Sequence, residues 1–213
     1  MTKTVLLYGD SIFWGVNAKT GFRHDNEHRV NNVIREALNG KVEIISEGHR
    51  GRTMFGENGR FPERDGLAQF GPIFASHLPI DVVVIMLGTN DLNDKTRHSA
   101  ADIANALVAY QEKMKNWSDF MGFAQPKILI VSPPDIEEKS LVKFAEIFGG
   151  SAELVGPTVD ALKRVSEEQG YIFMDSREIA RSIDTDGIHL NAAESRKLGA
   201  AIAEHLKVML SED

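Results

Sequence analysis

Cysteine is absent from the 213 residues, which excludes disulfides, zinc–thiolate sites and a cysteine nucleophile. Its absence fits a reducing compartment, and we expect a cytoplasmic location. Long apolar runs are missing too, since the longest, Val82 to Leu87, has the length of a strand and not the roughly 18 residues that cross a bilayer. The apolar segment at residues 5–8 is too short for a secretory signal. We therefore expect no membrane partner.

An excess of basic residues is also missing. The chain has 24 Lys and Arg against 31 Asp and Glu, a net charge of −7. Nucleic-acid binders usually carry a basic excess or stripe, so we expect no nucleic-acid partner. With ordinary globular proportions of apolar and charged residues, this length predicts one domain over residues 1–213.

Short apolar runs alternate with stretches of helical periodicity along the chain. Five runs predict strands, and four stripes of apolar residues predict helices. This alternation is typical of an α/β fold, a three-layer α/β/α sandwich around a flavodoxin-like five-stranded parallel sheet of order 2-1-3-4-5. Asn191 with Glu194 resembles a capping box at the last helix. The predicted strands are residues 5–8, 42–45, 81–87, 127–131 and 171–174, and the predicted helices are 30–38, 103–114, 154–165 and 198–209.

Polar residues directly follow the predicted strands, where ligands bind in open parallel sheets. They occur in four blocks that supply a hydroxyl, glycine amides, a side-chain amide, an acid and a histidine. These groups are what acyl transfer requires. Two long segments, 15–27 and 48–66, fit no element and are the kind of loop that is usually functional or mobile. The four blocks are Gly9-Asp10-Ser11, residues 48–52, Gly88-Thr89-Asn90-Asp91 and residues 184–189.

The residue types assign roles in such a reaction. A serine hydroxyl becomes nucleophilic when a base takes its proton, and His189 can be that base for Ser11. Asp186, three residues earlier, could orient the imidazole. The backbone N–H groups of Ser11 and Gly51 and the amide of Asn90 are candidates for stabilising the oxyanion.

Each assignment has a plainer alternative. Ser11 could cap a helix, Asn90 could be a turn residue and Asp91 a cap, while Asp10 is expected to shape the turn through backbone hydrogen bonds. Asp184 rivals Asp186 as the orienting acid.

Several other residues near the four blocks have two possible roles. Ile12, Trp14 and Ile188, with Phe13, could bind substrate or belong to the core. His49, Arg50 and Arg52 could face substrate or form a solvated turn.

The remaining histidines are expected to have no catalytic role. His24 and His28 show no clear ligand set, so we expect no metal, and His77, His98 and His205 are expected on the surface.

The four blocks together resemble the SGNH subgroup of the GDSL hydrolases, in the family's order and over nearly the whole chain. Three of them contain Ser11, Gly51 and Asn90, and the fourth is the Asp-x-x-His block at 186–189. The segments 85–91, 131–134 and 186–189, with Trp14-Gly15, are similar to the bacterial arylesterase/acyltransferase branch. Departures are Ile12 and Phe13 after the serine, and Gly51 where some acyltransferases of this branch carry alanine.

The resemblance implies a serine esterase that hydrolyses short-chain acyl esters, such as aryl or sugar acetates, through an acyl-enzyme. It also implies acyl transfer to alcohols or peroxide in some members, no cofactor, a small-molecule ester as the partner, and a homo-oligomer as large as an octamer. The alternatives are a carbohydrate acetylesterase or thioesterase with the same triad, and a catalytically silent carbohydrate-binding module on the same fold.

Overall fold

All five predicted strands join one parallel sheet in the computed structural model, which describes residues 2–56, 61–93, 96, 98–182 and 185–211. The strand order is β2-β1-β3-β4-β5, which confirms the order that the sequence predicts. Each strand is parallel to its neighbours, so the carboxyl ends of all five lie at one edge of the sheet. The strands are β1 (Lys3–Gly9), β2 (Val42–Gly48), β3 (Val82–Met86), β4 (Lys127–Val131) and β5 (Ile172–Met174).

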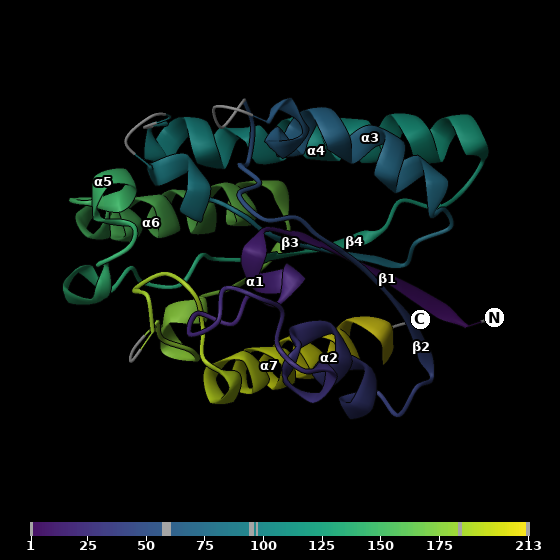
Figure 1. Ribbon diagram of the computed structural model, residues 1–213. Helices are drawn as coiled ribbons and strands as arrows, with labels where there is room; N and C mark the ends of the chain where they lie inside the picture. Colours follow the sequence, from purple (N-terminus) through teal and green to yellow (C-terminus); the bar gives the residue numbers. More distant parts are fainter. Residues whose placement is uncertain (1, 57–60, 94–95, 97, 183–184, 212–213) are drawn as a thin grey trace.

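Helices cover both faces of the sheet, as Figure 1 shows, with α3, α4 and α6 on one side and α2 and α7 on the other. In the part of the chain that the structure describes, no helix is both long and apolar enough to cross a membrane. The α-helices are α1 (Ser11–Trp14), α2 (Val30–Ala37), α3 (Gly66–Ser76), α4 (Ala100–Met121), α5 (Ala145–Phe148), α6 (Ala152–Gln169) and α7 (Ala192–Ser211).

The strands are continuously apolar because both faces of the sheet are buried. Leu6 and Tyr8 of β1 pack into the core beneath α3, α4 and α6, whereas Val5 and Leu7 pack into the core beneath α2 and α7. Successive side chains of a strand point to opposite faces, so a single strand contributes to two separate cores. This burial fixes the sheet and with it the loops at its carboxyl edge.

Helix α3 has no counterpart among the predicted helices. Its sequence contains Pro72 and begins at Gly66, both poor helix formers in an interior. Burial compensates, because Phe70 and Phe74 are fully buried. The Asp65 side chain caps the helix by accepting a hydrogen bond from the backbone N–H of Ala68.

Half of the predicted capping box forms at α7. The Oδ1 of Asn191 accepts from the backbone N–H of Glu194 at 2.9 Å. The Glu194 carboxylate, however, accepts from the backbone N–H of Arg181 and from Lys197. The helix cap therefore also fixes the segment that precedes the last catalytic block.

Candidate active site

Ser11, His189 and Asp186 form a continuous chain of hydrogen bonds at the carboxyl edge of the sheet. The Nε2 of His189 lies 2.9 Å from the Oγ of Ser11, and its Nδ1 lies 2.8 Å from the Oδ2 of Asp186. With the proton on Nδ1, the imidazole donates to the carboxylate and accepts from the serine hydroxyl. This is the arrangement in which a histidine can take the serine proton.

The short turn after β1 places Ser11 at the start of α1. Asp10 is the cap of this helix, since its Oδ1 accepts from the backbone N–H of Ile12 at 2.9 Å. Asp10 therefore has the turn-shaping role that the sequence predicts, and Ser11 is not the cap. Burial raises the pKa of Asp10 to about 6. Gly48 lets the end of β2 contact α1, because a Cβ there would lie 2.2 Å from the backbone nitrogen of Trp14.

Asp186 is held by the same short loop that carries His189. Its Oδ1 accepts from the backbone N–H groups of Ile188 and His189, at 3.2 and 2.9 Å. Burial raises the pKa of Asp186, but the hydrogen bond and charge of His189 outweigh it, so the pKa lies below its usual value. Asp186 is thus ionised at neutral pH and can stabilise an imidazolium. Asp184, the rival acid, lies outside the described residues.

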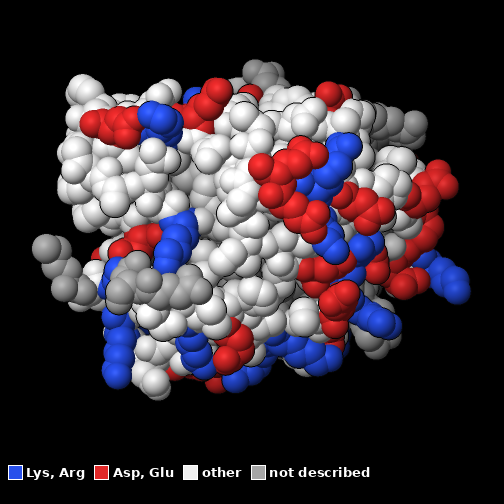
Figure 2. Space-filling view, turned by 180° about the vertical axis from the view of Figure 1, so that it is seen from behind, with Lys and Arg blue, Asp and Glu red and all other residues white. Residues whose placement is uncertain are grey.

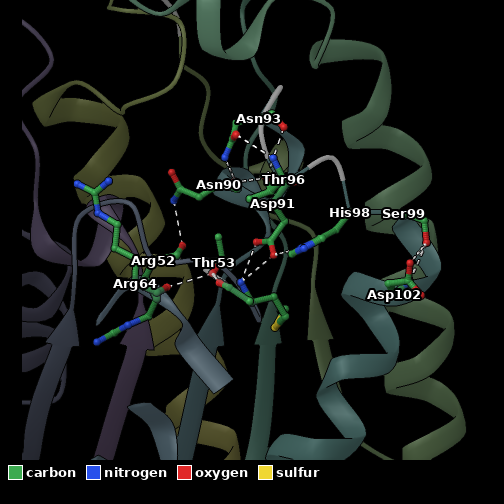
Figure 3. A network of polar contacts seen from close by, with 12 residues as sticks. Arg52, Thr53, Arg64, Asn90, Asp91, Asn93, Thr96, His98, Ser99 and Asp102 are labelled. Carbon is green, nitrogen blue, oxygen red and sulfur yellow. Dashed lines mark hydrogen bonds and ion pairs between the residues drawn. The ribbon is translucent and has the colours of Figure 1, made fainter. Parts of the chain in front are cut away.

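Gly51 and Asn90 both line the pocket in front of Ser11. Gly51 has a φ of +77°, a conformation that favours glycine and lets the backbone approach a ligand closely. The Nδ2 of Asn90 donates to the carbonyl of Arg52 at 3.0 Å, and it lies 3.4 Å from the Oδ2 of Asp10. The first of these contacts is drawn in Figure 3 and fixes the amide in the pocket that Ser11 also lines.

The pocket has a volume of about 180 Å³ and two unlike walls. One wall is polar and comes from the β2–α3 and β3–α4 connections. The other is apolar and comes mainly from α5. Ser11 and His189 line the same pocket. The polar wall consists of Arg50, Gly51, Arg64, Asn90 and Asn93, and the apolar wall of Phe144, Ile147, Phe148 and Ile188.

The structure corrects two of the predicted substrate-binding residues. Ile12 packs with Phe13 into the core beneath α2 and α7, and it does not line the pocket. Trp14 does not line the pocket either. Its ring instead lies beneath the guanidinium groups of Arg23 and Arg50, with the carbon centres 5.1 and 5.3 Å from the ring centroid. Ile188 is on the pocket wall, as the sequence predicts.

The segment of α5 supplies pocket residues that sequence reasoning missed. Phe144, Ile147 and Phe148 line the pocket, and the Phe144 ring packs edge-on to His189 at 6.0 Å between centroids. The spacing of Leu141, Phe144, Ile147 and Phe148 is helical and would have been the signal for a short apolar helix. Arg64 and Asn93 were missed as well, because neither belongs to one of the four blocks.

His49, Arg50 and Arg52, whose roles the sequence left open, occupy different environments in the structure. Arg50 lines the pocket. Arg52 is buried, lies over the Tyr8 ring, and donates to the carbonyls of Gly9 and Glu47. It therefore ties the end of β1 to that of β2. His49 is exposed, and its backbone N–H donates to Gly9.

A second aspartate–histidine pair lies beside the oxyanion candidates. Asp91 is fully buried; its Oδ1 lies 3.1 Å from the Nδ1 of His98, and both carboxylate oxygens accept from the backbone N–H of Met54. The His98 ring stacks on Phe55 at 4.0 Å. His98 is partly exposed, and Asp91 is a buried anchor and not a helix cap. Figure 3 shows Asn90 and Asp91 pointing apart, toward Arg52 and His98 respectively.

Among the described residues, no group of three or more His, Asp or Glu side chains is placed to hold a metal ion. His24 is buried, and its Nε2 contacts the carbonyl of Leu190 at 3.1 Å. It thus links the 15–27 segment to the loop of His189.

The family model of the GDSL-like lipases/acylhydrolases matches residues 7–196. Similar solved structures include the native aryl esterase of M. smegmatis (30% identity, TM-score 0.91, 97% of this chain and 99% of that one). A carbohydrate acetylesterase family member from Sinorhizobium meliloti is 31% identical, with a TM-score of 0.88 over 98% and 99% of the two chains. Est24, a carbohydrate acetylesterase from the same species, is 28% identical, with a TM-score of 0.90 over 97% and 99%. No curated protein matches the sequence. The chain is a carboxylic ester hydrolase of SGNH type, and it belongs to the GDSL-like lipase/acylhydrolase family.

Proposed function

We propose that this protein is a serine esterase that hydrolyses short-chain acyl esters through an acyl-enzyme on Ser11. The observation that carries the proposal is the hydrogen-bonded chain from Ser11 through His189 to Asp186. It faces a pocket whose polar wall includes both other oxyanion candidates.

The reaction would proceed in two halves. Ser11 Oγ attacks the carbonyl carbon, its proton passes to Nε2 of His189, and Asp186 stabilises the imidazolium. The backbone N–H groups of Ser11 and Gly51 and the side-chain amide of Asn90 donate hydrogen bonds that stabilise the oxyanion. Collapse of the intermediate expels the alcohol, which takes the proton from His189. Water then gives a proton to Nε2 of His189 and attacks the acyl-serine. Collapse of this second intermediate returns the proton to Ser11 Oγ and releases the carboxylic acid.

The size and lining of the pocket support a short acyl group. At about 180 Å³ the pocket is smaller than the roughly 300–1,000 Å³ typical of sites for drug-sized ligands. Phe144, Ile147 and Phe148 offer an apolar wall for an acetyl methyl group or an aryl ring. Similarity to an aryl esterase and to carbohydrate acetylesterases supports aryl and sugar acetates as the substrates, and an alcohol or peroxide could replace water in the second half.

Turnover of p-nitrophenyl acetate by wild type, Ser11→Ala and Ser132→Ala tests the proposal. Ser132 is the matched control, because it also follows a strand of the sheet but bonds to Asp175 and Ser176 and not to an imidazole. We expect Ser11→Ala to lose about 10⁴-fold in kcat, and Ser132→Ala to retain kcat within a few-fold. Retained activity in a folded Ser11→Ala protein would refute the nucleophile.

A further inference from the structure

Two arginines line the active-site pocket, and the mechanism above uses neither. Arg50 lies two residues before Arg52 on the β2–α3 connection, and Arg64 ends the short 3₁₀ turn that precedes α3. Both guanidinium groups rest on aromatic rings. The carbon centre of Arg50 is 5.3 Å from the Trp14 centroid, and that of Arg64 is 4.8 Å from the Phe61 centroid. Such stacking orients the charges without neutralising them.

Arg64 lies directly against the glycine of the oxyanion site. A Cβ built on Gly51 would lie 2.8 Å from the Nε of Arg64 and 2.9 Å from its Cζ. The Nε is buried, yet within the described part of the chain it has no hydrogen-bond partner. A buried polar atom without a partner is uncommon in folded proteins and calls for an explanation.

No carboxylate appears among the described residues that line this pocket. The pKa of His49, which partial desolvation lowers, is lowered further by the charges of Arg52 and Arg64 nearby. Glu63, which opposes this effect, is exposed and lies outside the lining. The chain as a whole carries −7, and on the face in Figure 2 acidic side chains are interspersed with basic ones and gather on one side. The two arginines on the pocket lining are thus cationic, whereas the net charge of the chain is negative.

We infer that Arg50 and Arg64 select esters that carry a carboxylate in their acyl or alcohol part. This inference rests on the proposed function and names a substrate class within it. The planar guanidinium fork of an arginine matches the geometry of a carboxylate. The apolar residues of the lining would hold the uncharged part of the ester.

The position of Arg64 would also set the orientation of a substrate that carries a carboxylate. A carboxylate at Arg64 would lie next to Gly51, so the ester carbonyl need be only a few bonds away to reach Ser11. In a pocket of about 180 Å³ this favours a compact ester, such as a half-ester of a short dicarboxylic acid or an acetate of a small hydroxy acid.

Two pairs of substrates distinguish the acyl part from the alcohol part. Phenyl hydrogen succinate is compared with its neutral methyl ester for the acyl part, and 4-acetoxybenzoate with methyl 4-acetoxybenzoate for the alcohol part. Acid release in a pH-stat, after subtraction of spontaneous hydrolysis, gives kcat/KM for each. The ratio of anionic to neutral ester is then compared between proteins, which cancels the intrinsic reactivities of the two esters.

The variants are Arg50→Gln, Arg64→Gln and the double substitution, and the control is Arg164→Gln. Arg164 is exposed on α6 and does not line the pocket, so its loss changes net charge by the same amount. In at least one pair we expect the wild-type ratio to exceed one and to fall about tenfold for each pocket arginine removed. The Arg164→Gln ratio should equal that of wild type. Added salt should lower the wild-type ratio, since these charges are partly exposed.

The outcomes separate the two proposals. If Ser11-dependent hydrolysis occurs but neither pair shows a preference that Arg50→Gln or Arg64→Gln reduces, only the inference about carboxylates is overturned. An equal change in Arg164→Gln would overturn it too, because the effect would then be one of net charge. If no ester is hydrolysed and Ser11 is not labelled by a serine-directed probe, both proposals fall.

Discussion

Two aspartate–histidine pairs lie at the same edge of the sheet in the described part of the chain, and they are built alike. In each, a carboxylate accepts from backbone N–H groups and from the Nδ1 of a histidine, at 2.8 Å for Asp186 and His189 and at 3.1 Å for Asp91 and His98. They differ in what the second ring nitrogen faces. Nε2 of His189 lies 2.9 Å from the Ser11 hydroxyl, whereas the His98 ring lies flat on Phe55.

The pairs also differ in electrostatics. Burial raises the pKa of Asp91, and its hydrogen bonds with His98 and the backbone only partly offset this rise. At Asp186 the bonds from His189 outweigh burial, and the pKa is lowered. The neighbouring Ser11 hydroxyl and the pocket thus distinguish the pair that we propose to be catalytic, Asp186 and His189, from the pair of Asp91 and His98.

Substitution of each histidine by glutamine should separate these roles most widely. His189→Gln removes the proton acceptor, and we expect kcat for p-nitrophenyl acetate to fall about 10⁴-fold. His98→Gln removes the imidazole that contacts the buried carboxylate of Asp91 and stacks on Phe55. We expect the free energy of unfolding to fall by about 1–3 kcal/mol, with kcat retained within a few-fold. Urea denaturation and steady-state kinetics measure both. Equal losses of kcat in two folded variants would contradict the distinction.

The neighbours Asn90 and Asp91 offer a second contrast, because their side chains point to opposite sides of one turn. Asn90→Ala removes an oxyanion donor and should lower kcat by about 10²- to 10³-fold, with a smaller effect on KM. Asp91→Asn keeps the shape of the anchor and should lower kcat by less than tenfold. If Asn90→Ala raised KM while kcat stayed unchanged, Asn90 would bind the ground state and would not stabilise the transition state.

The smallest expected effect is on stability, because the contributions of Asp91 and Asp186 to the free energy of unfolding should change in opposite directions with pH. Asp91 has a raised pKa, so its ionisation costs stability at pH 7, and this cost disappears as the pH falls through its folded pKa toward 3.8. Asp186 has a lowered pKa, so its stabilisation is present above 3.8 and is lost below it. As the pH falls from 7 to 3.8, the stability of wild type relative to Asp91→Asn should rise. As the pH falls further below 3.8, the stability of wild type relative to Asp186→Asn should fall. Shifts of the same sign in urea denaturation would contradict the assignment.

The sheet, and the edge of it at which Ser11, Asp186 and His189 lie, could be predicted because both follow from short sequence segments. Continuous apolar strands such as residues 82–86 indicate burial on both faces, and the alternation with helices fixes a parallel order. Parallel strands end at one edge, which brings Ser11, Gly51 and Asn90 together although they are far apart in sequence. His189 joins them through the Asp-x-x-His turn that positions it.

What could not be predicted depends on tertiary contacts. Ile12 is next to the nucleophile in sequence, but the first turn of α1 directs it into the core. Helix α3 could not be predicted because its sequence contains Pro72, and the helix is stabilised by the burial of aromatic side chains. Arg52 and Arg64 have the same chemistry, yet one is a buried tie between strands and the other lines the pocket. Only the packing of the β2–α3 connection separates them.

The most direct test of the central claim is the intact mass of the protein after reaction with a fluorophosphonate, for wild type, Ser11→Ala and Ser132→Ala. The account predicts one adduct on wild type and on Ser132→Ala, mapping to Ser11, and none on Ser11→Ala. Wild type that is folded yet unlabelled, or an adduct that persists in Ser11→Ala, would show that Ser11 is not the activated nucleophile.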